Sequence, residues 1–147
     1  NVIVARTFSK LHGLAGLRIG YALARPDLIA RMAKLKLVAV SSLGLAAASA
    51  SYGNMQFQAL SRKNLAAGVA ITTAALDELK LAYAPTRANF VFFDTGQPAA
   101  EFLAAMRQRG FSLGRPFPQY PSWCRVSMGT FPQMQLFANA LRAHYAG

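Results

Sequence analysis

The stretch of residues 7–21 holds the side chains of this sequence whose types and spacing could do chemistry. A lysine, Lys10, follows an apolar run and comes just after two hydroxyl residues, Thr7 and Ser9. Arg18 lies eight residues further on, across a glycine-containing loop. A lysine amine so placed can form a Schiff base with a carbonyl cofactor, and a planar cation with hydroxyl donors can bind a phosphate on that cofactor. Taken alone, the pattern also fits a surface lysine near a turn.

Arg125 is a second candidate, because it begins an apolar stretch beside Trp123. A guanidinium in a buried strand needs an anionic partner, and it offers two parallel donors to a carboxylate. The alternative is an ordinary ion pair, but the chain has only 5 acidic residues to supply one. We therefore expect Arg125 to bind the anionic group of a ligand.

Hydrophobic periodicity and turn residues predict the strands and helices that position these side chains. Strands are expected over residues 1–5, 19–24, 89–93, 111–113 and 125–128, the first of them buried. Helices are expected from residue 26, over 45–52, over 55–81 with a stop at Pro85, over 98–109 with Gly110 closing it, and over 132–145. The order of elements after residue 55 indicates a compact α+β lobe, and the residues before it indicate the end of a separate α/β unit.

The composition excludes several classes of protein. With 147 residues and 54% hydrophobic content, the chain has enough apolar material for a packed core and too much for wholesale disorder. A lone cysteine, Cys124, excludes a disulfide framework, and we expect a small buried thiol. No Cys and His spacing indicates a metal site.

The chain is strongly basic, with 16 Lys and Arg against 5 Asp and Glu and a net charge of +11. Such a charge attracts phosphates, nucleic acid or an acidic partner. The basic residues are scattered, and no RNA-binding or helix-turn-helix pattern is present, so no nucleic-acid partner is expected. A cofactor-free basic module that binds nucleic acid or an acidic partner stays open as an alternative.

Residues 37–61 form an uncharged stretch that is long enough to span a membrane. Serine, asparagine, glutamine and glycine interrupt it, which favours a packed helix over a transmembrane one. We expect no membrane partner, no targeting segment and a cytoplasmic location. Because the sequence opens inside a strand pattern and without methionine, we expect a fragment of a longer protein.

The run SKLHGLAGLRIGY at residues 9–21 resembles the signature of fold-type I aminotransferases that use pyridoxal phosphate (PLP), above all the histidinol-phosphate aminotransferase branch. The resemblance implies that Lys10 is catalytic and holds PLP as an internal aldimine. It also implies that Thr7, Ser9 and Arg18 bind the cofactor phosphate. His12, Tyr21 and His144 are expected to have no catalytic role.

Two later segments resemble parts of the same family's small domain. Asn89 opens a run similar to the strand that approaches the substrate pocket, and Arg125 opens the run RVSMGT, similar to the segment whose arginine grips the substrate carboxylate. Arg115 resembles a position where some relatives place a cation that reads the substrate side chain, with a solvated arginine at the rim as the alternative. The resemblance thus implies substrate-binding roles for Arg125, Asn89 and Arg115.

The resemblance also implies an organisation and an activity. Residues 1–54 correspond to the end of a PLP-binding large domain and residues 55–147 to the small α+β domain, in a protein that is a homodimer when intact. The activity would be transamination between a small-molecule amino donor and a 2-oxo acid, with this fragment inactive by itself. The family's aspartate that pairs with the pyridine nitrogen has no match here, and residues 131–133 depart from the usual acidic start of the last helix. A related PLP-dependent decarboxylase is the alternative within this class.

Overall fold

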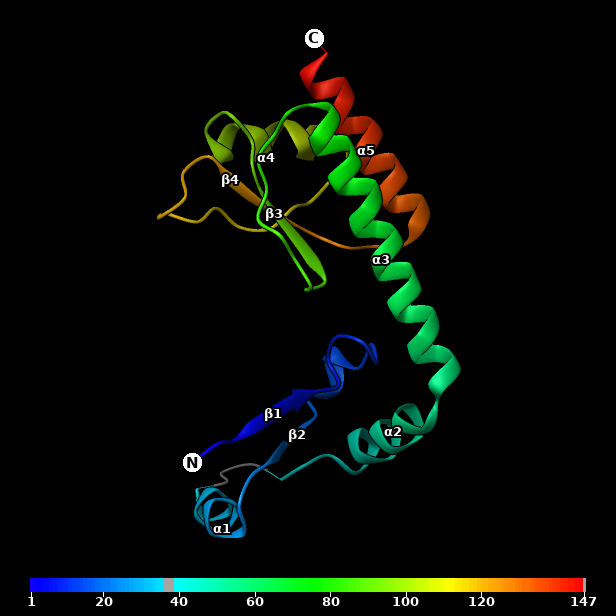
Figure 1. Cartoon of the computed structure of the whole chain (residues 1–147), viewed down its shortest axis with the longest axis vertical. Helices are drawn as coiled ribbons and strands as arrows, with labels where there is room; N and C mark the ends of the chain where they lie inside the picture. The colour runs from blue at the N-terminus through cyan, green and yellow to red at the C-terminus, as the bar shows by residue number, and fades with distance from the viewer. Residues whose placement is uncertain (36–38, 147) are drawn as a thin grey trace. The chain divides into compact units, whose positions relative to one another are not determined.

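The computed structural model describes residues 1–35 and 39–146. The chain divides into two compact units, Asn1–Arg62 and Lys63–Gly147 (Figure 1). Each unit combines helices with one pair of antiparallel strands, so both mix α and β structure.

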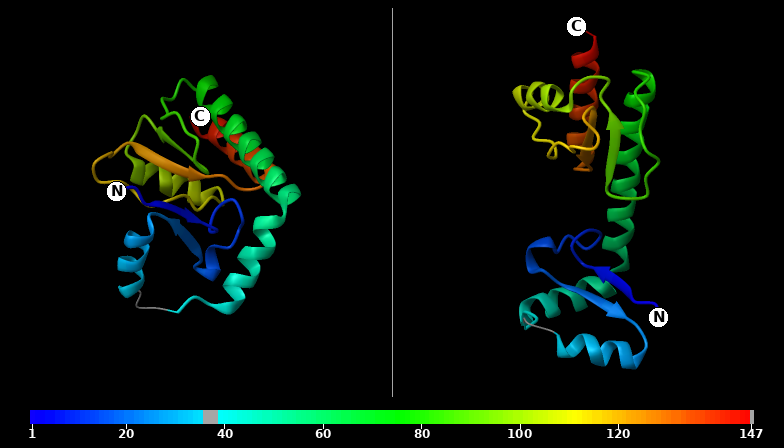
Figure 2. Two further views of the ribbon diagram at one scale, coloured as in Figure 1. Left: turned by 60° about the horizontal axis from the view of Figure 1, so that its bottom comes forward. Right: turned by 90° about the vertical axis from the view of Figure 1, so that its left-hand side faces the viewer.

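Unit 1 is built on a two-stranded hairpin, whose strands are β1 (Val4–Thr7) and β2 (Gly20–Leu23). They pair antiparallel in a register that runs from Val4↔Leu23 to Thr7↔Gly20. The loop between them contains a short 3-10 helix, η1 (Ala15–Leu17). Two helices follow, α1 (Pro26–Lys34) and α2 (Ser42–Gly53) (Figure 2).

Local sequence explains where both helices begin. Pro26 opens α1, where its fixed φ suits a helix start, and Asp27 adds a carboxylate to the first turn. At α2 the side chain of Ser41 caps the helix by accepting a hydrogen bond from the Gly44 amide at 3.3 Å. A Cβ at Gly44 would lie 3.3 Å from the carbonyl oxygen of Leu17, so glycine lets α2 approach η1 closely.

The expectation of a buried first strand over residues 1–5 is wrong in both limits and burial. β1 begins at Val4, and Val2 and Ile3 are 73% and 48% exposed. The reason is the register: the pairing ends at Val4↔Leu23, so the residues before Val4 have no paired residue in β2.

Unit 2 has a second strand pair covered by helices. α3 (Met55–Glu78) spans the division between the units and is followed by β3 (Phe90–Asp94), α4 (Ala99–Gln108), β4 (Trp123–Ser127) and α5 (Phe131–Tyr145). β3 and β4 pair antiparallel with Phe92 opposite Arg125. α3 and α5 run side by side, and a Cβ at Gly68 would lie 3.3 Å from Met134 (Figures 1 and 2).

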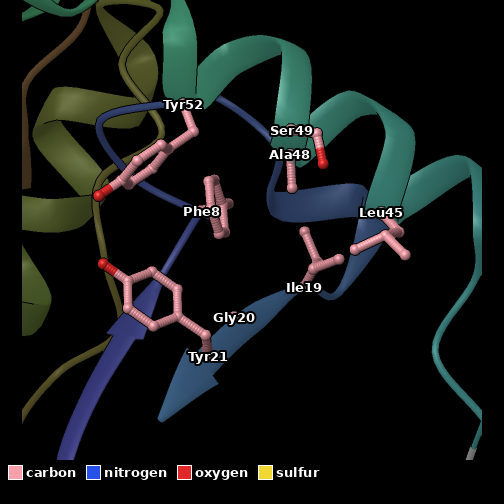
Figure 3. A pocket seen from close by; sticks show the side chains of 8 residues that line it. All are labelled: Phe8, Ile19, Gly20, Tyr21, Leu45, Ala48, Ser49 and Tyr52. Atoms are coloured by element: carbon pink, nitrogen blue, oxygen red, sulfur yellow. The ribbon is translucent and has the colours of Figure 1, made fainter. Parts of the chain in front are cut away.

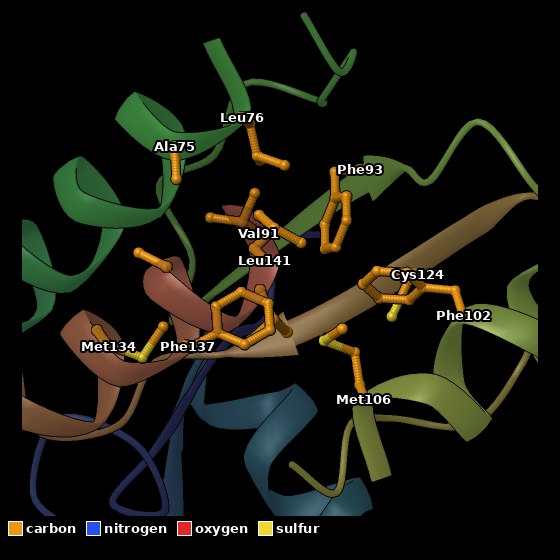
Figure 4. Close-up of a cluster of buried hydrophobic side chains, with 12 residues drawn as sticks. Ala75, Leu76, Val91, Phe93, Phe102, Met106, Cys124, Met134, Phe137 and Leu141 are labelled. Carbon is orange, nitrogen blue, oxygen red and sulfur yellow. The ribbon is translucent and has the colours of Figure 1, made fainter. Parts of the chain in front are cut away.

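The core of unit 2 lies between one face of this strand pair and the three helices (Figure 4). The largest of its side chains are at most 1% exposed: Leu76, Phe93, Phe102, Met106, Phe137 and Leu141. Because strand side chains alternate between faces, Val91 and Phe93 point into the core while Phe90 and Phe92 lie on the opposite face.

The expected strand over residues 111–113 is not formed. Phe111 donates its amide hydrogen to the Met106 carbonyl at 2.9 Å, which belongs to the end of α4. In the described part of the chain, the backbone link from this segment to β4 is a long bond, 3.4 Å, from the Gly114 amide to the Arg125 carbonyl. One such bond does not make a ladder, so residues 111–113 stay irregular.

The long helix α3 ends earlier than Pro85 predicts. Lys80 adopts a left-handed conformation with φ 57°, and the Leu81 amide turns back to the Leu76 carbonyl at 2.9 Å. This pattern is a Schellman motif, and it ends the helix at Glu78. Pro85 therefore lies in the connection to β3 and does not stop the helix.

The last helix has a well-formed start despite its departure from the acidic pattern. The Thr130 amide donates to Gln133 Oε1 at 2.8 Å, which satisfies a donor at the helix start. A Cβ at Gly129 would lie 2.6 Å from that same oxygen, so glycine makes room for the capping side chain. Gln133 thus does the work of the missing acidic residue.

The uncharged stretch 37–61 has its first two residues outside the described residues. Most of the remainder forms α2 and the first turns of α3, separated at Asn54. None of the helices in the described ranges combines the length and the apolar character needed to cross a bilayer.

Candidate active site

The β1–β2 hairpin brings together the four residues of unit 1 that are expected to meet a cofactor. Beyond the pair Thr7↔Gly20, the Phe8 amide donates to the Ile19 carbonyl at 3.1 Å, so the strands stay paired for one more step. The next residues on either side leave the hairpin at the same end. That end carries the predicted set, Thr7, Ser9, Lys10 and Arg18.

A local turn directs Lys10 away from the strand. The Ser9 amide donates to Thr7 Oγ1 at 3.0 Å, a side-chain turn that bends the chain just after β1. The Gly13 amide then donates to the Lys10 carbonyl at 3.0 Å and closes the following turn. Lys10 is exposed, so its amine is open to an incoming carbonyl group. Since Thr7 Oγ1 acts as an acceptor here, its hydroxyl hydrogen can still be donated to an anion.

Arg18 is held in an unusual backbone conformation. Its φ of 51° and ψ of 48° lie in the left-handed region, which costs a residue with a Cβ roughly 1–2 kcal/mol. Its Nη1 donates to the Ala15 carbonyl at 3.0 Å, so the side chain is folded over η1. Backbone strain of this kind is found where a side chain must be held in one direction. The remaining guanidinium donors can serve a phosphate.

Gly20 explains one of the glycines in the signature. A Cβ there would lie 2.6 Å from the Arg6 carbonyl oxygen, a distance that real side chains do not reach. Any other residue would push β2 away from β1 at the end that carries the candidate residues. Glycine at this position therefore preserves the geometry of the Lys10 turn.

His12 has a positioning contact that the sequence does not reveal. Its Nδ1 lies 2.8 Å from Ser51 Oγ, which ties the Lys10 turn to α2. The His12 ring also packs on Phe8 with the ring centres 4.7 Å apart. Ser51 lies 39 residues further along the chain, so no local pattern could predict the pair.

An apolar cavity lies beside the hairpin in unit 1 (Figure 3). It has a volume of about 480 Å³. Side chains from the hairpin and α2 line it: Phe8, Ile19, Gly20, Tyr21, Leu45, Ala48, Ser49 and Tyr52. Neither Lys10 nor Arg18 is among them, and the lining carries no charged group that could bind a phosphate. Tyr21, which lies in β2, lines this cavity and is 40% exposed.

Unit 2 holds the three residues predicted to bind substrate. Arg125 lies in β4 and is half-buried, whereas Arg115 is exposed in the loop that precedes β4. Asn89 immediately precedes β3, and its carbonyl accepts from the Met128 amide at 3.0 Å. The strand pair therefore carries Asn89 and Arg125, while Arg115 stands apart on its loop.

The ordinary ion pair considered for Arg125 is not formed. Within the described ranges, the salt bridges join Arg25 to Asp27 and Arg142 to Glu78. The Nε of Arg125 is buried and has no hydrogen-bond partner among residues 1–35 and 39–146. A half-buried guanidinium that is not paired with an acidic side chain suits the binding of an anionic ligand.

Cys124 is the buried thiol that the sequence predicts, at 2% exposure. Burial raises the pKa of its thiol to about 12, against a smaller lowering by the neighbouring Arg125. A thiol that stays protonated is a poor nucleophile and metal ligand. Across residues 1–35 and 39–146, no group of three or more His, Cys, Asp or Glu side chains could hold a metal ion.

Comparison with known proteins shows the family to which the chain belongs. A family model described as aminotransferase class I and II matches residues 1–141. The chain belongs to the class I and II aminotransferase family. A histidinol-phosphate aminotransferase of Symbiobacterium thermophilum is 40% identical over 146 residues, which are 97% of this chain and 40% of that protein. Histidinol-phosphate aminotransferase 2 of Ralstonia nicotianae is also 40% identical, over 88% of this chain and 36% of that protein.

A solved structure agrees with this family assignment. The crystal structure of histidinol-phosphate aminotransferase from Sinorhizobium meliloti, in complex with pyridoxal-5'-phosphate, matches with a TM-score of 0.82 and 30% identity. The match covers 98% of this chain and 42% of that one. This member of the aminotransferase family thus spans about 40% of the length of the relatives it matches. The alternatives of a decarboxylase or a cofactor-free basic module are not favoured by these matches.

Proposed function

We propose that the whole protein is a PLP-dependent aminotransferase that moves an amino group between a small-molecule amino donor and a 2-oxo acid. One observation carries this proposal. The β1–β2 pairing gathers an exposed lysine, two hydroxyls and a strained arginine at one end of a hairpin. The names of the relatives, which are histidinol-phosphate aminotransferases, support the same activity.

The residues of unit 1 fit the cofactor chemically. PLP carries an aldehyde and a phosphate, and the hairpin end offers an amine, two hydroxyls and a guanidinium with donors to spare. We assign Lys10 to the aldehyde and Thr7, Ser9 and Arg18 to the phosphate. When bound, PLP supplies a ring that accepts electrons from the substrate.

Lys10 has two tasks in this proposal. Its amine is the nucleophile that holds the aldehyde carbon covalently. Once the substrate amine has taken its place, Lys10 Nζ acts as the general base and acid that moves the proton at the substrate Cα. Both tasks need an amine on a short turn, close to the strand that anchors it, which the Thr7–Ser9 turn provides.

In unit 2, Arg125 is assigned to the carboxylate of the substrate. Two parallel guanidinium donors would fix the direction of that carboxylate, and the Nε without a hydrogen-bond partner among the described residues supports this assignment. Asn89 and Arg115 are assigned to the substrate as well, Asn89 beside β3 and Arg115 from its exposed loop. We also assign residues 1–54 to the large domain and 55–147 to the small domain.

We infer that the whole protein is a homodimer. Support comes from large apolar side chains of unit 1 that are 58–78% exposed, namely Leu23, Leu35, Leu43 and Leu45. Exposed apolar side chains can contribute to an interface with another chain. Light scattering of the whole protein should give twice the mass of one chain, and a monomeric mass would contradict the inference.

Covalent trapping tests the assignment of Lys10. The whole protein is loaded with PLP, reduced with borohydride and digested, and the labelled peptide is identified by mass spectrometry. We expect the pyridoxyl label on Lys10 and none in Lys10→Arg, which keeps the charge but is not a usable nucleophile. Lys34, Lys63 and Lys80 are exposed and serve as internal controls for non-specific labelling. Equal labelling of these lysines and Lys10 would overturn the proposal.

The phosphate assignment has its own control. Arg18→Lys keeps the charge but loses the planar donor pair, so PLP should bind about tenfold more weakly or worse. Arg31→Lys, on exposed α1, is the matched change and should leave PLP binding unaltered. If both variants bind PLP like the unmodified protein, Arg18 does not hold the phosphate.

A further inference from the structure

The guanidinium of Arg125 contacts two aromatic rings, where an acidic side chain would be expected. Its guanidinium carbon lies 5.3 Å from the ring centre of Phe90 and 5.8 Å from that of Phe117. Phe92 is the residue of β3 that lies opposite Arg125, and Phe90 comes two residues before it, on the same face of the strand pair. Phe117 belongs to the loop before β4. Both distances fall within the range of cation–π attraction.

The aromatic contacts differ from an ion pair in what they leave free. A carboxylate would occupy the N–H donors of the guanidinium, whereas a ring face attracts the cation without accepting them fully. The buried Nε of Arg125 accordingly has no hydrogen-bond partner in the part of the chain that the structure describes. The side chain is therefore held in place while its donors stay available to a ligand.

The loop that carries Phe117 is shaped to approach Arg125. A Cβ at Gly114 would lie 3.3 Å from the Arg125 carbonyl oxygen and 3.8 Å from its Nε, so glycine lets the backbone pass along the side chain. The Tyr120 amide donates to the Phe117 carbonyl at 2.9 Å, which closes the loop into a turn. Phe92 meets the rings of Phe117 and Tyr120 edge-on at 5.2 and 5.5 Å and fixes the turn against β3.

These side chains line a small, open cavity in unit 2. Its volume is about 310 Å³. The lining consists of Ala84, Phe90, Phe92, Phe117, Tyr120 and Arg125. Arg125 is the charged member of this lining, and the other members are apolar or aromatic. An anion that enters the cavity would meet one cation and no competing acidic side chain.

We propose that Phe90 and Phe117 are positioning residues that hold the Arg125 guanidinium, unpaired, for an anionic group of the substrate, either a carboxylate or a phosphate monoester. This inference rests on the proposed function, because it takes the anion to belong to the substrate. The rings replace the acidic partner that would normally orient a buried arginine. Removing a ring should loosen the guanidinium without changing the charge of the site.

Trp123 supplies a reporter for the test. It is the only tryptophan of the chain, and its ring centre lies 5.0 Å from that of Phe92. The 147-residue chain is titrated with inorganic phosphate and, separately, with acetate, at constant ionic strength set with sodium chloride. We expect a saturable change in Trp123 fluorescence, and the stronger of the two anions identifies the preferred group. Arg125→Met should abolish the change, while Arg107→Met, the same loss of charge at an exposed position of α4, should retain it.

The ring itself is tested by a pair of substitutions at Phe117, which is half-buried in a loop and outside the core. Phe117→Leu should weaken anion binding roughly three- to tenfold, the range of a cation–π contact, whereas Phe117→Tyr keeps a ring and should bind like the unmodified chain. In the whole protein, Phe117→Leu should raise KM for the amino donor and leave kcat within about twofold. A purely structural role would lower the thermal midpoint of Phe117→Leu and would not be rescued selectively by tyrosine.

The outcomes separate this inference from the proposed function. Equal anion binding by Phe117→Leu, Phe117→Tyr and the unmodified chain would overturn the inference, as would a fluorescence change that persists in Arg125→Met. Either result is compatible with a pyridoxyl label on Lys10, in which case the proposed function stands alone. A third outcome is that Phe117→Leu binds the anion more weakly and Phe117→Tyr does not, while Lys10 carries no label. That result would support the positioning role of the rings and contradict the aminotransferase assignment.

Discussion

His12 and Ser51 form a hydrogen bond of 2.8 Å that joins the turn carrying Lys10 to helix α2. Phe8 is buried and packs against the His12 ring, so the His12 side chain also covers one side of the turn. The link matters because Lys10 itself is exposed and has only short backbone turns to direct it. His12 therefore acts as a positioning residue for the turn.

Removing this hydrogen bond should loosen the Lys10 turn. We expect His12→Ala to lower the free energy of unfolding by about 1 kcal/mol and to speed hydrogen exchange of the amides in residues 9–13. Ser51→Ala should have a similar effect, and the double variant should cost little more than either single one. His12→Asn, which can place a donor or acceptor near the position of Nδ1, should restore part of the stability. Strictly additive costs would show that the two side chains are not coupled.

Two helix ends with the same geometry predict opposite effects of substitution. α3 and α4 both close with a Schellman motif, but the left-handed residue is Lys80 in α3 and Gly110 in α4. Glycine avoids the steric cost of that conformation. Lys80→Gly should therefore raise the free energy of unfolding by about 0.5 to 1 kcal/mol, and Gly110→Ala should lower it by about 1 kcal/mol.

Urea denaturation followed by far-UV circular dichroism measures both effects. A Cβ at Gly110 would meet nothing within 4 Å, so any loss in Gly110→Ala reports backbone conformation and not a clash. A destabilised Lys80→Gly would mean that the lysine side chain contributes more to the end of α3 than its φ of 57° costs.

These helix ends also show what the sequence can and cannot predict about the fold. Gly110 marks the end of α4 in advance because glycine commonly takes the left-handed position. Lys80 gives no such sign, and Pro85 says only that a helix cannot continue through it. Residues 111–113 look like a strand, but the Phe111 amide bonds to the Met106 carbonyl at the end of α4, a contact that the hydrophobic pattern does not predict.

The candidate site also has some features that the sequence predicts and others that only the structure shows. The spacing of Lys10 and Arg18 could be interpreted from the sequence because a continuous signature carries it. The missing acidic start of α5 could also have been resolved, since Thr130 and Gln133 form a recognisable capping pair. The His12–Ser51 hydrogen bond and the contacts of the Phe90 and Phe117 rings with Arg125 join residues that are not neighbours in the sequence, so only the structure reveals them.

The reactivity of the Cys124 thiol should report on unfolding of the core of unit 2. Burial raises the pKa of its thiol from 9.0 to about 12, and the thiolate is the form that reacts with disulfide reagents. At pH 8 the folded chain should therefore react slowly, and the rate should rise in parallel with unfolding by urea. Since the folded pKa is raised, this thiol contributes stability below pH 9 that is lost as the pH rises toward 12. Fast labelling that does not depend on urea would mean that the core opens locally around β4.

His144 makes the stability of unit 2 sensitive to acid. Its Nε2 lies 2.6 Å from Gln97 Nε2, and an amide N–H can donate only to an unprotonated ring nitrogen. Burial first, and the positive charge of Arg109 second, lower the pKa of His144 from its usual 6.5. The unfolded chain then binds the proton more readily, so the contribution of His144 is complete above pH 6.5 and is lost as the pH falls through the folded pKa.

Urea midpoints measured between pH 5 and pH 8 test this dependence on His144. The midpoint should decline below about pH 6.5, and His144→Phe, which keeps an aromatic ring beside Phe102, should flatten the decline. Arg109→Gln removes the second cause of the lowered pKa of His144. The urea midpoint should then decline less at low pH than in the unmodified chain, but it should still decline because His144 stays buried. Both variants retain His12, the other histidine of the chain. An unchanged acid profile in His144→Phe would assign the sensitivity to a different group.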